Sequence, residues 1–344
     1  MTGRMENEEK INKAICESLE AMPVYVNEWY RYLKASNRTA ATCRDLLYKL
    51  RRFLSFINSD VGNVRIWEIT SEEVEKYFMI IQTKAVKRGD ETRFEYTSAA
   101  YKQGIWSCLN NFFGFLKRKK YIEENYMEYI QRPRNSDRSR INSERVLLTK
   151  EDFNNILHNV IDKSGTGKSL SYKNRNSRRD LAIILLFMTT GMRKTALAGI
   201  NTSDINLRKR TITIIDKGDV THIYTLGDKV FNAITEWLKE RDKMLEAKHL
   251  KTDALFITGS GNRMQGNAIY AMIDRCCSSA LGYHISPHKL RAGFCSIMFE
   301  ETGNIEFVRR AVGHADVSTT QRYIVTRNDE RERAAHIMND ILEI

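Results

Sequence analysis

The stretch that decides the fold is residues 287–323, PHKLRAGFCSIMFEETGNIEFVRRAVGHADVSTTQRY. Its first residue is a proline, which predicts a helix start directly before His288, and Arg291 follows three residues later. A glycine precedes His314, and nine residues lead from His314 to Tyr323. The stretch therefore predicts short helices separated by turns, with titratable side chains close to the helix ends.

Two further elements precede this stretch. An apolar helix is predicted over 181–200, after a polar loop over 163–179, and a glycine interrupts the helix just before Arg193. Apolar and polar residues alternate in 209–226 on both sides of a turn that carries Lys217, which predicts a β-hairpin. Helices are expected at about 228–247, 266–281, 287–300, 304–312, 317–326 and 329–342.

The N-terminal half predicts a helical bundle over 21–131. A helix starting at Thr39 has apolar residues at helical spacing along one face. Thr70 can cap a second helix, and a third begins near Ser98. The apolar residues of the first helix are Cys43, Leu46, Leu47, Leu50, Phe53, Leu54 and Ile57.

The chain of 344 residues is long enough for two domains. The fold class expected is mainly α with a small β-hairpin or sheet (α+β). An arginine-rich segment without periodicity separates the two halves; it is either a solvated linker or a basic strap along a phosphate backbone. The predicted parts are a polar lead-in (1–20), the helical bundle (21–131), a basic linker (132–146), a second domain (147–327) and a C-terminal helix (328–344).

Composition narrows the classes of partner. Lys plus Arg number 55 and Asp plus Glu 43, a net charge of +12, which is typical of nucleic-acid binding but also fits an anionic membrane surface. No run of 18 apolar residues and no signal-peptide pattern occurs, so neither a membrane span nor a leader is expected. The six cysteines lack paired spacing, which indicates reduced thiols in the cytoplasm.

Two other patterns carry little weight. Residues 165–169, GTGKS, resemble the end of a phosphate-binding loop, but the position that requires the first glycine is Asp162. A possible metal set, Cys276, Cys277, His284 and His288, fits no zinc spacing, and Pro287 would break a helix face that carries both histidines. Core cysteines are the better explanation. The sequence therefore predicts no nucleotide cofactor and no metal.

Taken together, the separate signals resemble the tyrosine recombinase (phage integrase) family. The family's order is Arg, Lys, His-x-x-Arg, His and Tyr, and every position is filled here. The resemblance extends over about 150–330 at the level of motifs, and over 20–131 only in helical character, as the family's core-binding domain. The residues that match are Arg193, Lys217, His288, Arg291, His314 and Tyr323.

The resemblance implies a role for each of these residues in breaking a DNA phosphodiester. The two arginines would bind non-bridging phosphate oxygens, where a guanidinium stabilises transition-state charge. Tyr323 would be the nucleophile, His288 would accept its proton, and His314 would donate to a phosphate oxygen. Lys217 would protonate the leaving 5′ oxygen, which leaves a 3′-phosphotyrosyl bond. The bond energy is kept, so no cofactor is implied.

The chain departs from the family at two positions. Members often carry an acid three residues after the first arginine, and this chain has Ala196 there. The residue after Arg291 is Ala292, where many members have histidine. Neither departure removes a group assigned to bond chemistry, so both are expected to affect the rate rather than the reaction.

The resemblance also implies partners. It implies that the chain acts on double-stranded DNA with specific recombination sites and forms a four-way junction intermediate. It also implies a homotetramer held together by the C-terminal helix. Accessory DNA-bending proteins are compatible with the resemblance but are not specified by it. That helix has an apolar stripe, which packs either on its own domain or on a neighbouring protomer; the resemblance favours the neighbour. No membrane partner is expected, and the location is cytoplasmic, with the nucleoid. Integration and excision of a mobile element, resolution of chromosome or plasmid dimers and DNA inversion all use this chemistry, and we expect a bacterial or phage mobile element. Lys- and Asn-rich usage indicates a low-GC genome.

Two other functions fit parts of the sequence. A type IB topoisomerase-like relaxase would use the same cleavage chemistry without a partner duplex, but it would not need an apolar C-terminal helix. A non-catalytic DNA-binding regulator would not need the six matching residues. A site-specific strand-exchange enzyme accounts for both features.

Overall fold

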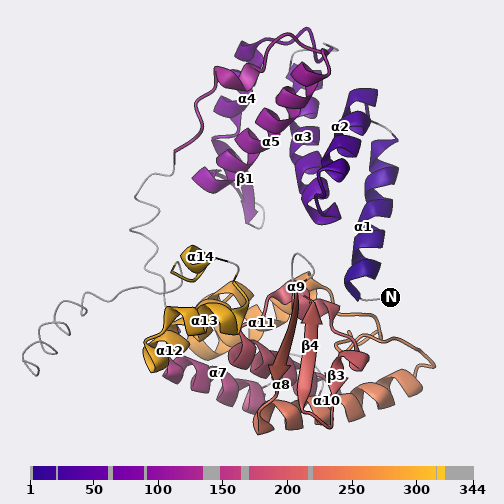
Figure 1. Ribbon diagram of the computed structural model, residues 1–344, viewed down its shortest axis with the longest axis vertical. Helices are drawn as coiled ribbons and strands as arrows, with labels where there is room; N and C mark the ends of the chain where they lie inside the picture. The colour runs from indigo at the N-terminus through magenta and orange to yellow at the C-terminus, as the bar shows by residue number, and fades with distance from the viewer. Residues whose placement is uncertain are drawn as a thin grey trace, which may run out of the picture. The chain divides into compact units, whose positions relative to one another are not determined.

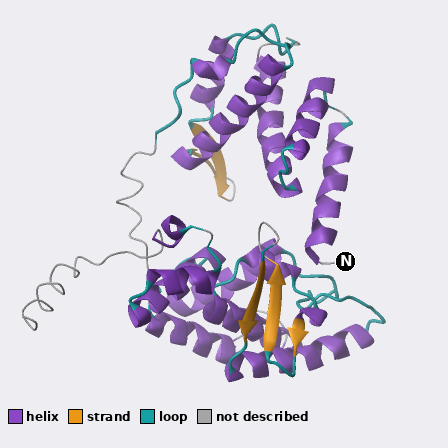
Figure 2. Ribbon diagram, viewed as in Figure 1, coloured by secondary structure: helices purple, strands orange, loops and turns teal. Residues whose placement is uncertain are grey.

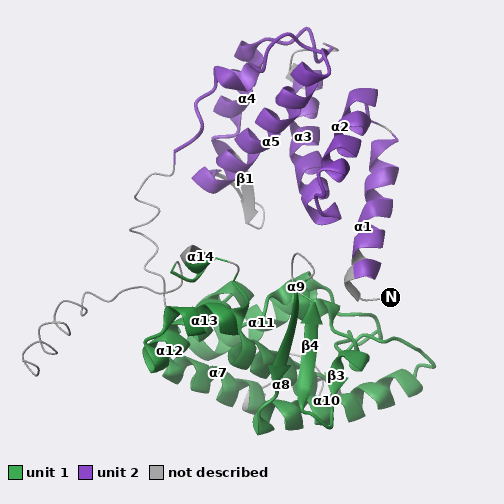
Figure 3. Ribbon diagram, viewed as in Figure 1, with its two compact units in different colours: residues 1–4, 145–344 green, residues 5–144 purple. Residues whose placement is uncertain are grey.

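The computed structural model describes residues 3–20, 22–60, 65–88, 91–134, 148–163, 170–215, 220–314 and 316–321. The chain divides into two compact units (Figure 3). We call residues 5–144 the helical unit and residues 145–344, which cluster with residues 1–4, the mixed unit. Figure 2 shows that helices dominate both and that a three-stranded antiparallel sheet lies in the mixed unit. The expected fold class, mainly α with a small sheet, is confirmed.

The helical unit has one core, formed by the inward faces of its helices. Trp29 of α2 and Phe112 of α5 are fully buried in it, and their rings meet edge to face at 5.2 Å. The predicted helix after Thr39 is confirmed as α3. The elements are α1 (Gly3–Leu19), α2 (Val24–Ala35), α3 (Ala40–Asp60), α4 (Ser71–Ile80), β1 (Thr83–Arg88), β2 (Glu91–Tyr96), α5 (Ala99–Arg118) and the 3-10 helix η1 (Tyr126–Glu128) (Figure 1).

Two parts of the helical unit differ from the expectation. The first 20 residues were expected to be a loose polar lead-in, but they contain α1, whose Ile11 and Ile15 are buried in the core. Glu8 also accepts a hydrogen bond from the Ala40 backbone N–H at the start of α3. These few apolar residues suffice to pack α1 against the core because they lie on one face of the helix. The β1–β2 hairpin was not predicted either.

The mixed unit is organised around α8. Residues 182–187 of this helix are buried, because α7, α10 and α12 pack around it. The indole N–H of Trp237 on α10 donates to the Leu255 carbonyl, which satisfies its polar atom inside the core. The elements are α7 (Lys150–Lys163), α8 (Leu170–Thr190), α9 (Lys194–Gly199), η2 (Thr202–Asp204), β3 (Ile205–Asn206), β4 (Thr211–Ile215), β5 (Thr221–Thr225), α10 (Asp228–Glu246), α11 (Gly266–Leu281), α12 (Pro287–Thr302), α13 (Ile305–Val312) and α14 (Val317–Gln321).

The predicted hairpin is confirmed as β4 and β5, and the short strand β3 pairs with the other edge of β4. Ile212 and Ile214 face the core, as the alternation predicted. The expected polar loop over 163–179 is wrong in its second half, because α8 already begins at Leu170. At the end of the expected loop, the Arg179 guanidinium donates to the buried Asp180 carboxylate, so these two buried charged groups are paired.

Several predicted features lie outside the described residues. They are the GTGKS segment (165–169), most of the linker (135–147), Lys217, Tyr323 and the C-terminal helix (328–344). Among the residues that the structure describes, no helix has the length and apolar character needed to cross a membrane.

Candidate active site

Arg193 follows a sharp break between two helices. α8 ends at Thr190, and Arg193 is the residue that precedes α9, with an extended backbone. Gly191 makes this break possible, because its φ of +57° is unfavourable for other residues. A Cβ at that position would lie 2.6 Å from Cδ1 of Phe294 on α12. The glycine therefore lets the Arg193 turn sit directly against α12.

Arg291 connects three of the predicted motif segments. Its side chain on α12 is only 2% exposed. Its guanidinium donates to the Gly191 carbonyl at 2.5 Å and to the Val312 carbonyl at 2.9 Å. Gly191 lies two residues before Arg193, and Val312 lies two residues before His314. The buried guanidinium thus fixes the backbones that carry the first arginine and the second histidine.

His288 lies in the first turn of α12. The helix begins with Pro287 at its first position, and the Ser286 side chain accepts from the Lys289 N–H. Partial burial lowers the pKa of His288 below its ordinary value of 6.5, and the nearby charges of Lys194, Arg291 and Arg193 lower it further. The imidazole is consequently neutral near pH 7, which is the form that can accept a proton.

We expect Lys194→Met to raise the pKa of His288 towards its ordinary value of 6.5, because the neighbouring charge with the largest effect on it is removed. The measurement is an NMR titration of the His288 ring in the DNA-free protein. Because the pKa of His288 in the folded protein lies below its ordinary value of 6.5, protonation of this ring opposes folding. The free energy of unfolding is therefore highest above pH 6.5 and falls as the pH drops from 6.5 towards the lowered pKa. Lys239→Met, an exposed lysine on α10, is the control. An unchanged His288 titration in Lys194→Met would contradict this reading.

His314 is buried between the end of α13 and α14. Its Nδ1 lies 2.9 Å from the Thr320 hydroxyl, and both side chains are at most 2% exposed. Its backbone N–H donates to the Arg309 carbonyl, and its carbonyl accepts from the Arg309 guanidinium at 2.6 Å. When the hydroxyl donates to Nδ1, the ring proton is on Nε2, the tautomer that can donate to a ligand.

The β4–β5 hairpin contacts the same segment. Gly313 has a φ of +67°, and a Cβ there would lie 2.5 Å from Cε1 of the His222 ring on β5. His222 pairs with Ile214, one residue from the end of β4. The end of β4 and the start of β5, which flank residues 216–219, therefore lie beside the Gly313–His314 segment. Lys217 itself is outside the described residues.

The structure thus places four of the six predicted residues, Arg193, His288, Arg291 and His314, on segments that meet, and Lys217 and Tyr323 lie outside the described residues. Sequence reasoning missed Thr320, Lys194 and His222. The signal for Thr320 was its place three residues before Tyr323, and for Lys194 its place beside Arg193. For His222 no local signal exists, because its contact with Gly313 depends on the fold.

Thr320→Val is expected to slow the chemistry at this site and to lower thermal stability. Valine has the same shape but leaves the His314 Nδ1 without its hydroxyl partner, at a cost of about 1–3 kcal/mol for a buried polar atom. The measurements are thermal unfolding and the rate of DNA cleavage, with Thr225→Val, an exposed threonine on β5, as the control. Equal rates in Thr320→Val and the control would show that the hydroxyl does not orient His314.

The histidine and cysteines considered for a metal have other surroundings. His284 Nδ1 lies 2.6 Å from Asp274 Oδ1, and its Nε2 lies 2.8 Å from the Tyr270 hydroxyl. Burial raises the pKa of the Cys276 thiol to about 11 and raises that of Cys277 as well. In the described ranges, no group of three or more His, Cys, Asp or Glu side chains could hold a metal ion.

The sequence matches one protein-family model and several known proteins of one kind. Residues 147–330 match the Phage integrase family. Tyrosine recombinase XerC of Mannheimia succiniciproducens is 25% identical over 304 residues, which cover 88% of this chain and 92% of that protein. XerC of Haemophilus influenzae is 35% identical over 146 residues, which cover 42% of this chain and 48% of that protein.

Solved structures share the fold. XerH site-specific recombinase bound to its difH substrate has a TM-score of 0.65 at 19% identity, covering 96% of this chain and 89% of that one. A lambda integrase tetramer bound to a Holliday junction has a TM-score of 0.60 at 14% identity, covering 88% of this chain and 77% of that one. At these identities the likeness concerns the fold alone.

Proposed function

The chain belongs to the phage integrase family of tyrosine recombinases, and from this premise we propose that it cleaves and rejoins duplex DNA at specific sites through a 3′-phosphotyrosyl intermediate. The observation that supports this proposal best is the buried Arg291 guanidinium. It joins the segments of Arg193 and His314, and the residue before His314 lies against His222 near the turn end of the β4–β5 hairpin; His288 is on the same helix as Arg291. These are the groups that stabilise charge on a phosphorane and move a proton.

The proposed reaction proceeds in two balanced steps. The Tyr323 oxygen attacks the phosphorus, its proton passes to His288, and the bond from phosphorus to the 5′ oxygen breaks. Lys217 gives that oxygen a proton, so a free 5′-hydroxyl forms. In the second step a 5′-hydroxyl from the partner duplex gives its proton to Lys217 and attacks the phosphorus. The bond from phosphorus to the Tyr323 oxygen breaks, and His288 returns a proton to that oxygen. Arg193, Arg291 and His314 stabilise the phosphate oxygens in both steps.

The proposed assembly is a homotetramer on two DNA sites that passes through a four-way junction. The helix at 328–344 would dock on a neighbouring protomer, and the arginine-rich linker would follow the DNA between the two units. The lambda integrase structure, a tetramer on a Holliday junction, shares the fold and so supports this choice by likeness. We further propose a cytoplasmic site of action and a role in a mobile element.

The experiment is the covalent capture of DNA by the full chain. The protein is incubated with nicked duplex fragments in EDTA, and the DNA that stays attached after denaturation is sequenced. We expect one recurring site, attachment at a 3′ phosphate and no loss of cleavage in EDTA. Attachment at a 5′ phosphate, a strict need for magnesium or no adduct would contradict the proposal. Relaxation of supercoiled DNA without any preferred site would indicate a relaxase instead.

A further inference from the structure

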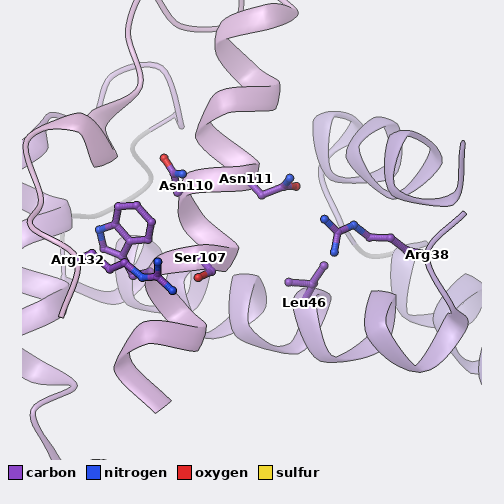
Figure 4. A pocket seen from close by; sticks show the side chains of 7 residues that line it. Arg38, Leu46, Ser107, Asn110, Asn111 and Arg132 are labelled. Atoms are coloured by element: carbon purple, nitrogen blue, oxygen red, sulfur yellow. The ribbon is translucent and has the colours of Figure 1, made fainter. Parts of the chain in front are cut away.

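Positive side chains of this chain have two different kinds of surroundings. In the helical unit, the exposed Arg38 and Arg132 line a groove with a volume of about 300 Å³ beside α5 (Figure 4). In the mixed unit, Lys194 is half-buried, and its Nζ lies 5.4 Å from the centroid of the Tyr270 ring. Water screens exposed charges, whereas a half-buried ammonium acts more strongly on its neighbours. Lys194 is therefore placed to influence a titratable group nearby.

The charge of Lys194 is not explained by the stability of the helices beside it. Lys194 is the first residue of α9, and its stem passes the first residue of α11, where a Cβ at Gly266 would lie 3.9 Å from Cε of the lysine. The N-terminus of a helix carries partial positive charge, so a cation beside it is disfavoured. The Tyr270 ring offsets this effect, because the face of an aromatic ring attracts an ammonium. The ring therefore holds the ammonium at a place that the helix ends alone would not favour.

The Tyr270 ring is itself held by a second set of contacts. The centroids of the Tyr270 and His284 rings lie 5.8 Å apart with an angle of 42° between the planes, and the Tyr270 hydroxyl lies 2.8 Å from His284 Nε2. His284 Nδ1 lies 2.6 Å from Asp274 Oδ1, which also accepts from the Ser278 hydroxyl at 2.6 Å. Side chains from α11 and from the loop before α12 thus hold the ring under Lys194. The contact between the two rings does not need the hydroxyl.

The titratable group on which Lys194 acts is His288, in the first turn of α12. Burial lowers the pKa of His288 most, and the charges that lower it further are all positive: Lys194 most strongly, then Arg291 and Arg193. Charged groups on the helices packed against α12, and on α12 itself, have other partners. Asp152 on α7 accepts from Thr149, Asp180 on α8 from Arg179, Asp274 on α11 lies beside His284, Glu306 on α13 accepts from Arg309 and Arg310, and Lys289 donates to the His284 carbonyl. The surroundings of His288 therefore favour the uncharged imidazole.

We propose that Lys194 and Tyr270 are positioning residues for the proposed base: the ring holds the ammonium near His288, and the ammonium keeps the imidazole uncharged while DNA is bound. This rests on the proposed function, in which His288 accepts the Tyr323 proton. The phosphate to be cleaved is an anion, and an anion beside a histidine favours the protonated ring, which cannot accept a proton. The Lys194 charge opposes that effect. The chain should therefore cleave DNA at a lower pH than it would without this pair.

Substitutions at the two positions separate the charge from the ring. Lys194→Met removes the charge and keeps most of the stem, whereas Lys194→Arg keeps a cation that also stacks on aromatic rings. Tyr270→Leu removes the ring and keeps the charge, whereas Tyr270→Phe keeps the ring and removes only the hydroxyl. Both positions are half-buried and lie outside the core, so the variants should fold. The control is Lys239→Met, at an exposed lysine of α10.

The first measurement is the rate of adduct formation on nicked DNA as a function of pH, with the full chain at saturating concentration. We expect Lys194→Met to move the acid side of the profile up by about one pH unit, which means about tenfold slower cleavage well below pH 6.5. Tyr270→Leu should move it in the same direction by less.

Lys194→Arg, Tyr270→Phe and Lys239→Met should keep the acid side of the profile where the wild type has it. A merely structural defect would lower the rate by the same factor at every pH, so the position of the acid side is the readout that matters. An acid side of Lys194→Met that coincides with that of Lys239→Met would overturn the proposal.

A double variant tests whether the ring acts through the ammonium. If it does, Lys194→Met combined with Tyr270→Leu should have the same pH profile as Lys194→Met alone, because the ring then has no charge left to hold. If the acid side instead moves by the sum of the two single displacements, Tyr270 acts independently of Lys194, and its assignment as a positioning residue is wrong.

An NMR titration of the His288 ring in the DNA-free protein separates this proposal from the proposed function, because it does not depend on cleavage. Tyr270→Leu should move the midpoint in the same direction as Lys194→Met, and Tyr270→Phe should leave it unchanged. If the wild type forms no adduct, the recombinase chemistry fails; a midpoint that moves then still supports the action of the pair on His288, and one that stays overturns it. If the adduct forms and the midpoints move while the acid side of the rate profiles does not, the pair does not serve the reaction, and only this proposal fails.

Discussion

Tyr323→Phe is expected to abolish the covalent adduct with DNA completely and to leave duplex binding within a few-fold of the wild type. Phenylalanine keeps the ring but lacks the oxygen that would bond phosphorus. The measurement is the fraction of nicked duplex that remains attached to protein in a denaturing gel, together with affinity under native conditions.

Tyr270→Phe is the matched control for this result. It removes a hydroxyl from the same unit, where, among the described residues, the Tyr270 hydroxyl hydrogen-bonds with the side chain of His284. The ring under the Lys194 ammonium is retained, so the surroundings of His288 should be preserved. An adduct that persists in Tyr323→Phe would show that another side chain is the nucleophile, and mapping of the DNA-bearing peptide would identify it.

The local features of the fold were predictable from the sequence because they depend on spacing. The apolar face of α3 and the alternation in β4 each follow from one short segment. Caps are similarly local: Pro287 and Ser286 fix the start of α12 wherever that helix packs. Residue types and order also sufficed to nominate Arg193, His288, Arg291 and His314, because the family's motifs are short.

Features that depend on partners distant in the chain could not be predicted. The 2% exposure of Arg291 and its two carbonyl partners arise only once α12 lies between the Gly191 turn and the end of α13. The helix α1 was missed because its apolar residues are few, and their burial depends on the rest of the bundle. The hydrogen bond from the Trp29 indole N–H to the Asn111 side chain likewise requires residues that are 82 positions apart in the chain to meet.

Arg291→Ala is expected to have two separable effects, a loss of stability and a larger loss of catalysis. Removing the guanidinium leaves the buried carbonyls of Gly191 and Val312 without these donors, at about 1–3 kcal/mol each. For a unit of this size, that cost corresponds to a fall in melting temperature of roughly 4–24 °C. Cleavage should fall by roughly 10²–10³-fold or more, the usual effect of removing a donor to transition-state charge.

Arg291→Lys distinguishes the two effects, because lysine keeps the positive charge but cannot bridge two carbonyls with a planar fork. We expect it to melt between the wild type and Arg291→Ala, and to cleave far more slowly than the wild type at a temperature where all three are folded. Arg310→Ala is the control, since that arginine is 76% exposed and pairs with Glu306 at the surface. DNA affinity should stay within about tenfold in every variant, because one phosphate contact is a small part of the total. Wild-type cleavage by folded Arg291→Ala would remove this residue from the chemistry and leave it a purely structural connection between the two helix ends.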